Sequence, residues 1–263
     1  MNINDYIKLI PEEKPLDHIV TDGGMCGIFR KICCIGDSLS SGEFESLDEN
    51  GNKGYHDMFE YSWGQYIARD IGAEVLNFSK GGMTASAYWN GFADQNDFWS
   101  TEKLCQAYII ALGVNDLLGL RQEIGSVSDI NINDCTKNSE TFAGYYARII
   151  QKIKCMRPDA FFFLMSMPRE NDINDKTREK HSSLLHSLTD VFDHSYVIDL
   201  FQYAPIYDEA FKKRFYMGGH MNPAGYLLTA RIVESYMDYI IRHNPQDFCQ
   251  VGFIGTPYYN RDL

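Results

Sequence analysis

Five short apolar segments are spaced along the chain, and they predict the strands of a buried sheet. They cover residues 31–35, 74–78, 107–112, 160–165 and 196–200. Each segment is largely apolar throughout instead of alternating with polar residues, which is typical of strands that are covered on both faces. The pattern therefore predicts a parallel sheet in the interior of the protein.

Helical patterns lie between these segments and after the last of them. Apolar residues recur every three or four positions over residues 61–71, 140–156, 175–192 and 224–241, as on one face of an amphipathic helix. Strands that alternate with helices imply a doubly wound α/β domain, with helices on both faces of the sheet. We expect one such domain over residues 31–242.

The two ends of the chain do not follow this repeat. Residues 1–30 contain Pro11, Pro15 and a glycine turn, and we interpret them as an N-terminal extension with a helix and a possible hairpin. Residues 243–263 are rich in aromatic and turn residues, and we expect a C-terminal extension that packs on the core. Neither extension carries residues that suggest chemistry.

The charge of the chain argues against several classes of partner. The 263 residues include 36 acidic and 24 basic side chains, so the net charge is -12. A surface this acidic repels phosphate backbones and anionic lipids, and we expect no nucleic-acid or membrane partner. No apolar segment approaches the ~20 residues that span a bilayer. The sequence does not indicate an oligomeric state.

The cysteines and the N-terminus indicate where the protein works. The seven cysteines are odd in number and show no C-x-x-C spacing, which suits a reducing compartment better than a disulfide framework or a zinc site. The first residues lack the basic and apolar regions of a secretory signal. Both observations favour a cytoplasmic protein.

Polar and glycine residues gather where the predicted strands end. Ser38, Gly82 and Asn115 lie just past the first, second and third strands, and His220 precedes the last helix. In parallel sheets, ligands bind at the carboxyl ends of the strands. The predicted fold therefore brings the first three residues to one edge of the sheet and can bring His220 there as well.

These four segments resemble, in order, the sequence blocks of the GDSL, or SGNH, hydrolase family. The matching segments are Gly36-Asp37-Ser38-Leu39, residues 77–82, residues 113–116, and His220 with residues 222–226. The resemblance implies that Ser38 is the nucleophile, that His220 is the catalytic histidine, and that Gly82 and Asn115 belong to the oxyanion hole. It also implies a flavodoxin-like order of the five strands and a hydrolase that needs no metal and no organic cofactor.

The chemistry of ester hydrolysis suits these residue types. A serine hydroxyl is a poor nucleophile until a base takes its proton, and histidine titrates near neutral pH. The negative charge of the tetrahedral intermediate needs fixed donors, each worth ~3 kcal/mol. The backbone N–H groups of Ser38 and Gly82 and the side-chain amide of Asn115 can supply three donors.

The last block departs from the family pattern. The family usually places an aspartate three residues before the histidine to orient it, and this chain has Met217 there. A backbone carbonyl in residues 215–218 can hold the imidazole instead, leaving a Ser–His dyad. An acid from elsewhere can fill the place; the candidates by chain position are Asp199, Asp208 and Glu209. The third alternative is a site that binds its ligand without turning it over.

Four other residues are candidates for the substrate pocket. Trp89 and Trp99 follow the second block, where aromatic faces suit sugar rings or an acyl group, although they can equally pack on the sheet. Arg169 follows the fourth strand and can contact a carboxylate or a sugar hydroxyl, or simply lie in solvent. Asp37 adjoins the nucleophile.

We therefore expect an esterase that acts on small acyl esters, with an acetyl group on a carbohydrate as one such substrate. The partner is a small-molecule ester. Two alternatives remain at this point. One is a catalytically impaired module that binds esters or carbohydrates, and the other is a lipase or thioesterase for longer chains. The sequence shows no long apolar segment of the kind that covers a lipase site.

Overall fold

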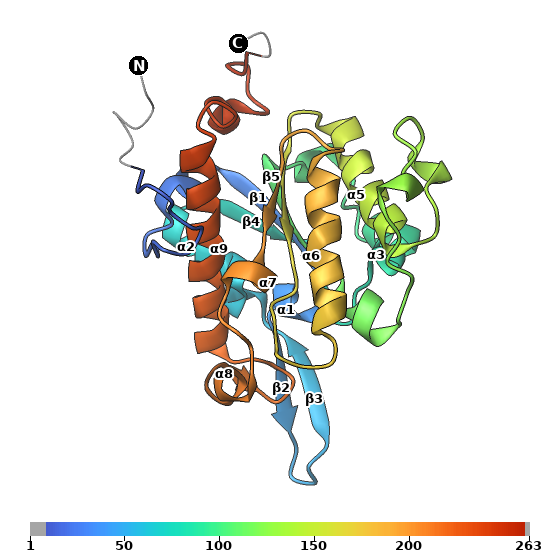
Figure 1. Ribbon diagram of the computed structural model, residues 1–263, viewed down its shortest axis with the longest axis vertical. Helices are drawn as coiled ribbons and strands as arrows, with labels where there is room; N and C mark the ends of the chain where they lie inside the picture. Colours follow the sequence, from blue (N-terminus) through green and yellow to red (C-terminus); the bar gives the residue numbers. More distant parts are fainter. Residues whose placement is uncertain (1–8, 261–263) are drawn as a thin grey trace.

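The computed structural model describes residues 9–260, and its centre is a parallel sheet between two layers of helices (Figure 1). The sheet has the order β4-β1-β5-β6-β7, and every neighbouring pair of strands is parallel. The strands are β1 (Lys31–Gly36), β4 (Glu74–Asn77), β5 (Ala107–Ala111), β6 (Phe161–Met165) and β7 (Ser195–Ile198). All five predicted strands are confirmed, and their order is that of a flavodoxin-like fold.

Helices cover both faces of the sheet, as the apolar patterns predict. Figure 1 shows α2 (Trp63–Ile71) and α9 (Pro223–His243) on one side of the sheet. It shows α3 (Ala85–Ala87), α5 (Phe142–Met156) and α6 (Asp175–Thr189) on the other side. Each layer buries its apolar residues against the sheet, so the core has two halves.

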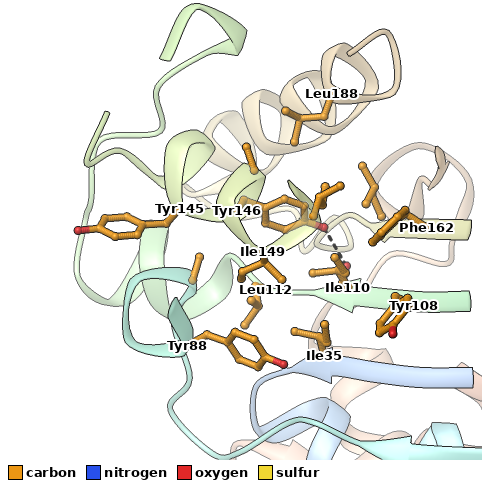
Figure 2. Packing of buried hydrophobic residues seen from close by; sticks show 14 of the residues in the cluster. Ile35, Tyr88, Tyr108, Ile110, Leu112, Tyr145, Tyr146, Ile149, Phe162 and Leu188 are labelled. Atoms are coloured by element: carbon orange, nitrogen blue, oxygen red, sulfur yellow. Dashed lines mark hydrogen bonds between the residues drawn. The ribbon is translucent and has the colours of Figure 1, made fainter. Parts of the chain in front are cut away.

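Tyr146, in the half of the core under α5, shows how a buried hydroxyl can be satisfied. Tyr146 is fully buried, and its hydroxyl donates to the carbonyl of Ile110 on β5 at 3.1 Å (Figure 2). Tyr88 and Ile35 pack nearby in the same cluster. A buried hydroxyl without a partner would cost about 1–3 kcal/mol, so this bond lets a tyrosine occupy the core.

The ends of the long helices follow local sequence rules. Ser62 caps α2 by accepting from the N–H of Gln65, and Gly72 ends the helix with a left-handed φ of 66°. Asn222 caps α9 by accepting from the N–H of Gly225, and Pro223 is the first residue of the helix.

Short elements complete the described chain. They are the helices α1 (Ser38–Ser41), α4 (Ala93–Gln95), α7 (Leu200–Tyr203) and α8 (Glu209–Phe215), and the π-helical turns Tyr88–Phe92 and Val114–Gly119. A two-stranded hairpin, β8 (Tyr216–Met217) and β9 (His220–Met221), precedes α9.

A second hairpin was not predicted, and it lies directly after the first block. It consists of β2 (Glu43–Leu47) and β3 (Lys53–Asp57), which are antiparallel and project away from the sheet (Figure 1). Most of its residues are exposed, so its sequence lacks the apolar run that identifies a buried strand. Phe44 is an exception: it is buried and packs edge-on against Tyr226 of α9 at 5.4 Å.

The terminal segments differ from each other. Of the helix and hairpin expected in residues 1–30, the described part, residues 9–30, forms the 3-10 helix Gly24–Ile28 and turns; the first eight residues lie outside the described residues. At the other end, Phe248, Val251 and Ile254 are buried in the half of the core that contains α9. Residues 261–263 lie outside the described residues.

Two findings bear on the remaining expectations from composition. The seven cysteines are all free, and Cys33 and Cys34 are buried in β1. Within residues 9–260, none of the helices has the length and apolar content that a bilayer crossing requires.

Candidate active site

The predicted nucleophile lies at the carboxyl end of the central strand β1. Gly36 ends the strand, and a Cβ there would lie 2.2 Å from Ser40 Oγ, so only glycine permits this tight turn. Asp37 then caps α1: its side chain accepts from the N–H of Leu39 at 3.1 Å. Ser38 is the first residue of that helix and is half-buried at the mouth of a cavity.

Asn115 lies beside the nucleophile, after β5. It belongs to the π-helical turn Val114–Gly119, which follows Gly113 at the end of the strand. Its side-chain amide donates to the carbonyl of Met83 at 3.1 Å and reaches Asp37 Oδ2 at 3.5 Å. These two acceptors hold the amide nitrogen at the edge of the sheet, next to the segment that carries Ser38.

Gly82 lies in the loop after β4 and has a left-handed φ of 73°, a conformation that favours glycine. Within residues 9–260, its backbone N–H donates to no protein acceptor. The residue is not among those that line the cavity at Ser38. Its N–H is therefore free to bond a ligand, but the structure does not place that ligand.

His220 reaches the same cavity from the β8–β9 hairpin. Its side chain is 15% exposed, and the ring packs edge-on against Tyr55 of β3 at 5.9 Å. Ser38, Asn115 and His220 line one cavity of about 390 Å³. The structure thus brings together three of the four residues that name the SGNH family.

Of the alternatives for the group that holds His220, the backbone carbonyl is wrong, and an acid from elsewhere in the chain takes the place. Nδ1 lies 3.0 Å from Glu45 Oε1, so the acceptor is a side-chain carboxylate and not a main-chain carbonyl of residues 215–218. Nε2 lies 3.0 Å from Glu43 Oε1, and no hydrogen bond joins it to Ser38 Oγ in the described part of the chain. Both carboxylates come from strand β2.

The three candidate acids also lie elsewhere. Asp199 accepts from Ser166, Ser182 and His186 between β7 and α6. Asp208 caps α8 by accepting from the N–H of Phe211 at 2.9 Å, and Glu209 follows it in the first turn of that helix. Chain proximity to His220 suggested these residues, whereas the acid that reaches the ring is 175 positions away in the sequence.

Glu45 has more polar partners than any other group at the ring. Its carboxylate accepts from Lys53 Nζ at 2.8 Å and from the N–H of Gly219 at 2.5 Å, in addition to the contact with His220. The bond to Lys53 is the main reason that the pKa of Glu45 lies below its usual value, and the bonds to His220 and Gly219 act in the same direction. Glu45 is therefore ionised at neutral pH.

The two glycines before His220 give Glu45 its access to the ring. A Cβ on Gly218 would lie 2.2 Å from Glu45 Oε2, and a Cβ on Gly219 would lie 2.5 Å from Oε1. Gly218 also has a left-handed φ of 73° in the turn between β8 and β9. Any side chain at these two positions would push the carboxylate away from Nδ1.

Glu43 lies on the other side of the ring, in a less favourable environment for its charge. Burial is the main cause of the raised pKa of Glu43; Asp57 and Glu45 raise it further, and His220 opposes them. A Cβ on Gly81 would lie 2.1 Å from Glu43 Oε2, so the glycine of the second block leaves room for this carboxylate.

Asp37 is a further titratable group of the site. It is almost fully buried and lines the cavity. Burial raises the pKa of Asp37 to about 7, with smaller contributions from the nearby carboxylates of Asp116 and Glu43. Burial likewise raises the pKa of Asp116 to about 6, and its side chain accepts from the N–H of Ala85 at 2.8 Å. Asp116 thus connects its own loop to the start of α3.

The remaining pocket candidates lie away from this cavity. Trp89 and Trp99 pack against each other, with ring centroids 6.4 Å apart, on the half of the core that contains Tyr88. The Arg169 guanidinium lies over the ring of Phe201 at 4.6 Å. None of the three lines the cavity at Ser38, so of the four proposed pocket residues only Asp37 does.

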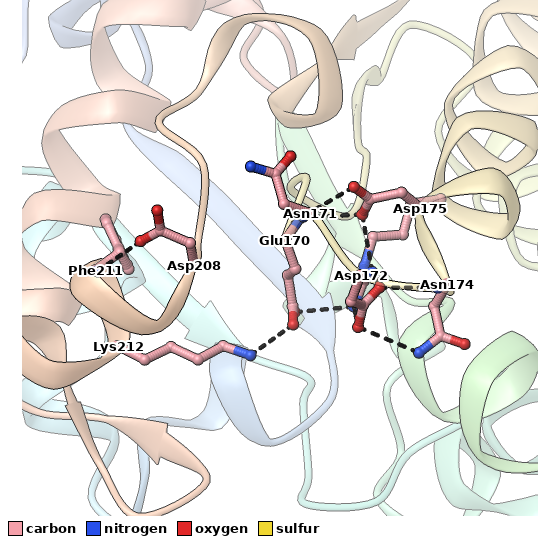
Figure 3. A network of polar contacts seen from close by, with 9 residues as sticks. Glu170, Asn171, Asp172, Asn174, Asp175, Asp208, Phe211 and Lys212 are labelled. Atoms are coloured by element: carbon pink, nitrogen blue, oxygen red, sulfur yellow. Dashed lines mark hydrogen bonds and ion pairs between the residues drawn. The ribbon is translucent and has the colours of Figure 1, made fainter.

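Three charged residues that the sequence did not single out line the cavity instead. Glu170 accepts from Lys212 Nζ at 2.6 Å (Figure 3) and from Arg178 at 3.1 Å. Arg178 is buried and also pairs with Asp172 and Asp175, whose positions Figure 3 shows. This network joins the loop after β6 to α6 and α8 and gives one wall of the cavity a polar character.

A small apolar cavity of about 50 Å³ adjoins the larger one. The two share Asp37, Leu39, Val114, Met167 and Pro168, and Trp63 and Tyr207 also line the small one. Within residues 9–260, no group of three or more histidine, cysteine or acidic side chains is arranged to hold a metal ion.

The carboxyl edge of this flavodoxin-like sheet thus carries a serine, an asparagine and a histidine around one cavity. A model of the GDSL-like lipase/acylhydrolase family matches residues 34–228, which is most of the chain. The chain belongs to this family and is by class a carboxylic ester hydrolase.

Solved structures show the same fold at low sequence identity. A family two carbohydrate esterase from Clostridium thermocellum, in complex with cellohexaose, has a TM-score of 0.56 and 18% identity. The match covers 83% of this chain and 65% of that one. A carbohydrate esterase family 2 enzyme with a carbohydrate-binding domain, from Corynascus thermopiles (Myceliophthora fergusii), has a TM-score of 0.54 and 15% identity, with 81% and 66% covered.

A third structure is covered almost completely by the match. It is a putative lipolytic protein of the G-D-S-L family from Desulfitobacterium hafniense DCB-2, with a TM-score of 0.51 and 17% identity. The match covers 78% of this chain and 98% of that one. No curated protein matches the chain.

Proposed function

We propose that the protein hydrolyses esters of small acyl groups on polar alcohols, carbohydrates among them, through an acyl-enzyme on Ser38. The observation that carries this proposal is the single cavity that Ser38, Asn115 and His220 line together. These residues provide a hydroxyl, an amide donor and an imidazole within one site, which is the set of groups that acyl transfer requires.

The reaction begins at Ser38. Its Oγ attacks the ester carbonyl while His220 Nε2 takes the hydroxyl proton, and a tetrahedral intermediate forms. The N–H groups of Ser38 and Gly82 and the amide of Asn115 donate to its oxyanion. His220 then returns the proton to the leaving alcohol, and the acyl group stays on Ser38. Water, activated by the same imidazole, hydrolyses the acyl-enzyme and restores the free serine.

The two adjoining cavities support the choice of substrate. The volume of the small apolar cavity is about 50 Å³, which has room for a short acyl chain but not for a long one. The larger cavity has Glu170, Arg178 and Lys212 on its wall, and these groups suit the hydroxyls of a polar alcohol. Two of the structural neighbours are carbohydrate esterases, which supports the same choice.

A series of p-nitrophenyl esters tests the acyl preference. We expect kcat/KM for acetate and butyrate to exceed that for laurate, because the small cavity cannot hold a long chain. Faster hydrolysis of laurate would favour a longer-chain lipase or thioesterase. Acetylated sugars and acetylated simple alcohols, compared at equal concentration, then test the polar alcohol.

A second candidate is a binding module that does not turn its ligand over. One observation favours it: His220 Nε2 contacts Glu43 and not Ser38, so the serine is not activated in this arrangement. A fluorophosphonate probe separates the two, because covalent labelling needs an activated hydroxyl. Labelling of the protein that is lost in Ser38→Ala supports the esterase, whereas a folded protein that binds acetylated sugars without labelling supports the binding module.

A further inference from the structure

The ring of His220 lies between two carboxylates of a single strand. Glu43 and Glu45 are two positions apart on β2, so their side chains point to the same face of the strand. Phe44, between them, points the other way and is buried against Tyr226 of α9. This packing fixes the strand on the body of the protein and thereby fixes both glutamates relative to the imidazole.

The contact with Glu45 determines which ring nitrogen carries the hydrogen. An ionised carboxylate is an acceptor only, so Nδ1, at 3.0 Å, must donate to it. In a neutral ring, Nε2 then has the free lone pair. That tautomer is the one a histidine needs to take a proton from a serine.

The contact with Glu43 has the opposite consequence. An unprotonated carboxylate and an unprotonated Nε2 both only accept, so the 3.0 Å contact requires one proton between them. Nδ1 already donates to Glu45, and the ring is therefore an imidazolium or Glu43 is a carboxylic acid. In both cases Nε2 cannot take the proton of Ser38.

We propose that Glu45 is the carboxylate that positions His220 for catalysis, and that Glu43 competes with Ser38 for Nε2. The β2–β3 hairpin would thus supply the acid that the family usually places three residues before the histidine. It would also supply a second acid that prevents Nε2 from taking the proton of Ser38. This inference rests on the proposed function, because it assigns roles within the same hydrolytic site.

The surroundings of each glutamate agree with its role. Glu45 is held by Lys53, Gly219 and His220 together, and two glycines leave space for it, so it is fixed in place and ionised. Among residues 9–260, Glu43 has no cation other than His220 within salt-bridge distance. The titratable groups that face Glu43 or its ring partner are Asp37, Glu45, Asp57, Tyr55, His220 and Tyr226. Three of the groups around Glu43 are thus other carboxyl groups.

The proton balance of the cycle follows from these contacts. The proton between Nε2 and Glu43 leaves to solvent, which frees the Nε2 lone pair. The Ser38 hydroxyl proton then moves to Nε2 as the Oγ–carbonyl carbon bond forms, and it later passes to the leaving alcohol. Nδ1 keeps its hydrogen and Glu45 stays ionised throughout, so no other proton donor or acceptor is needed.

Substitutions at the two glutamates should have opposite effects. We expect Glu45→Ala to lower kcat about 10²–10⁴-fold, with a smaller change in KM, because the ring loses its tautomer and its orientation. We expect Glu43→Ala to raise kcat/KM at acidic pH and to move the acidic limb of the pH profile about 1–2 pH units lower, because the anion that favours the imidazolium is gone. Glu49→Ala, in the exposed turn of the same hairpin, is the matched control for loss of an acid.

A rescue experiment separates positioning from a structural role. Met217 lies directly opposite His220 in the β8–β9 pair, so an aspartate there is on the same side of the hairpin as the ring. We expect Met217→Asp in the Glu45→Ala background to recover at least about tenfold in kcat, since it restores a carboxylate within reach of Nδ1. A merely structural Glu45 would not allow such a recovery.

The measurements are kcat, KM and their pH profiles with p-nitrophenyl acetate, together with ¹⁵N chemical shifts of His220. The shifts should show hydrogen on Nδ1 in the unaltered protein and a mixture of tautomers in Glu45→Ala. If Glu45→Ala does not fold, Glu45→Gln replaces it, with the same expected direction.

The outcomes also separate this inference from the proposed function. An unaltered protein that neither hydrolyses esters nor reacts with a fluorophosphonate contradicts the proposed function itself. An active protein whose Glu45→Ala form retains full kcat overturns the role of Glu45. An active protein in which Glu43→Ala loses as much kcat as Glu45→Ala overturns the competition and makes Glu43 a catalytic residue.

Discussion

The two sides of the active site are built in different ways. On the sheet side, Ser38 and Asn115 follow the strands β1 and β5 directly, and each is held by backbone groups and side chains of neighbouring loops. On the hairpin side, Glu43 and Glu45 come from a polar projection outside the sheet and act on a histidine far away in the sequence. The sheet side follows from the fold, whereas the hairpin side depends on contacts between distant segments.

The two sides also differ in the catalytic roles that we propose for their residues. In the mechanism that we propose, the sheet side carries the groups that bond the reacting atoms, so its loss should remove the reaction. The hairpin side carries groups that act through the imidazole. Their loss should slow the reaction or change its pH dependence. The predictions that follow test this division, from the largest effect to the smallest.

Ser38→Ala should have the largest effect. We expect hydrolysis of p-nitrophenyl acetate to fall by more than about 10³-fold, because no other hydroxyl can form the acyl-enzyme. The melting temperature and the circular dichroism spectrum check that the fold is intact, and Ser46→Ala, at an exposed position of β2, is the control. A folded variant with substantial residual activity would remove Ser38 from the reaction.

Asn115→Ala should come next. We expect kcat to fall about 10²–10³-fold with little change in KM, because the amide stabilises the oxyanion chiefly in the transition state. Steady-state kinetics over a range of substrate concentrations give both constants. A raised KM at constant kcat would mean that Asn115 binds the substrate and does not stabilise the intermediate.

The contributions of Asp37 and Glu45 to the free energy of unfolding should change with pH in opposite directions. Burial raises the pKa of Asp37 to about 7, so its contribution to the free energy of unfolding is present at pH 4 and is lost as pH rises through 7. The pKa of Glu45 is lowered, chiefly by Lys53, so its contribution is lost as pH falls through that lowered value.

Urea unfolding of Asp37→Asn and of the unaltered protein at pH 5 and pH 8 measures the first of these contributions. We expect the variant to gain stability relative to the unaltered protein between the two values, by up to about 3 kcal/mol. An equal difference at both pH values would show that the carboxyl of Asp37 titrates normally in the folded state.

Lys53→Ala should have the smallest effect. Lys53 is about half exposed and pairs with Glu45 at 2.8 Å, and exposed ion pairs contribute ~0.2–1 kcal/mol. We therefore expect kcat to fall by no more than about fivefold, and less at high salt, since screening already weakens the pair. Lys213→Ala, on α8, removes the same charge away from Glu45 and is the control. A loss as large as that of Glu45→Ala would mean that Lys53 does more than support the carboxylate.

The same division marks what the sequence could predict. The five strands, the four long helices and the positions of Ser38, Asn115 and His220 at one cavity follow from apolar periodicity and from short motifs. These features are local, because each depends on residues that are close in the sequence. Even there, Trp89 and Trp99 proved to be core residues, since an aromatic run does not reveal which face it presents.

The hairpin residues could not be predicted from local patterns. Glu43 and Glu45 lie in a polar segment that resembles any solvent-exposed strand, and only the fold brings them to His220. Arg178 and Lys212 were missed for a similar reason: charged residues of amphipathic helices normally face solvent, but here they close one wall of the cavity. One signal was available, namely two glycines at positions 218 and 219 beside a missing acid at 217.

Those two glycines link sites that are far apart in the chain. Glu45 can reach Nδ1 only while positions 218 and 219 lack a Cβ, so a change at either glycine and a change at Glu45 should not be independent. Related sequences should accordingly fall into two groups: one with an acid three residues before the histidine, and one with a Gly-Gly pair there and a Glu-x-Glu soon after the nucleophile. Such paired variation would let the second kind of site be recognised from sequence, without a structure.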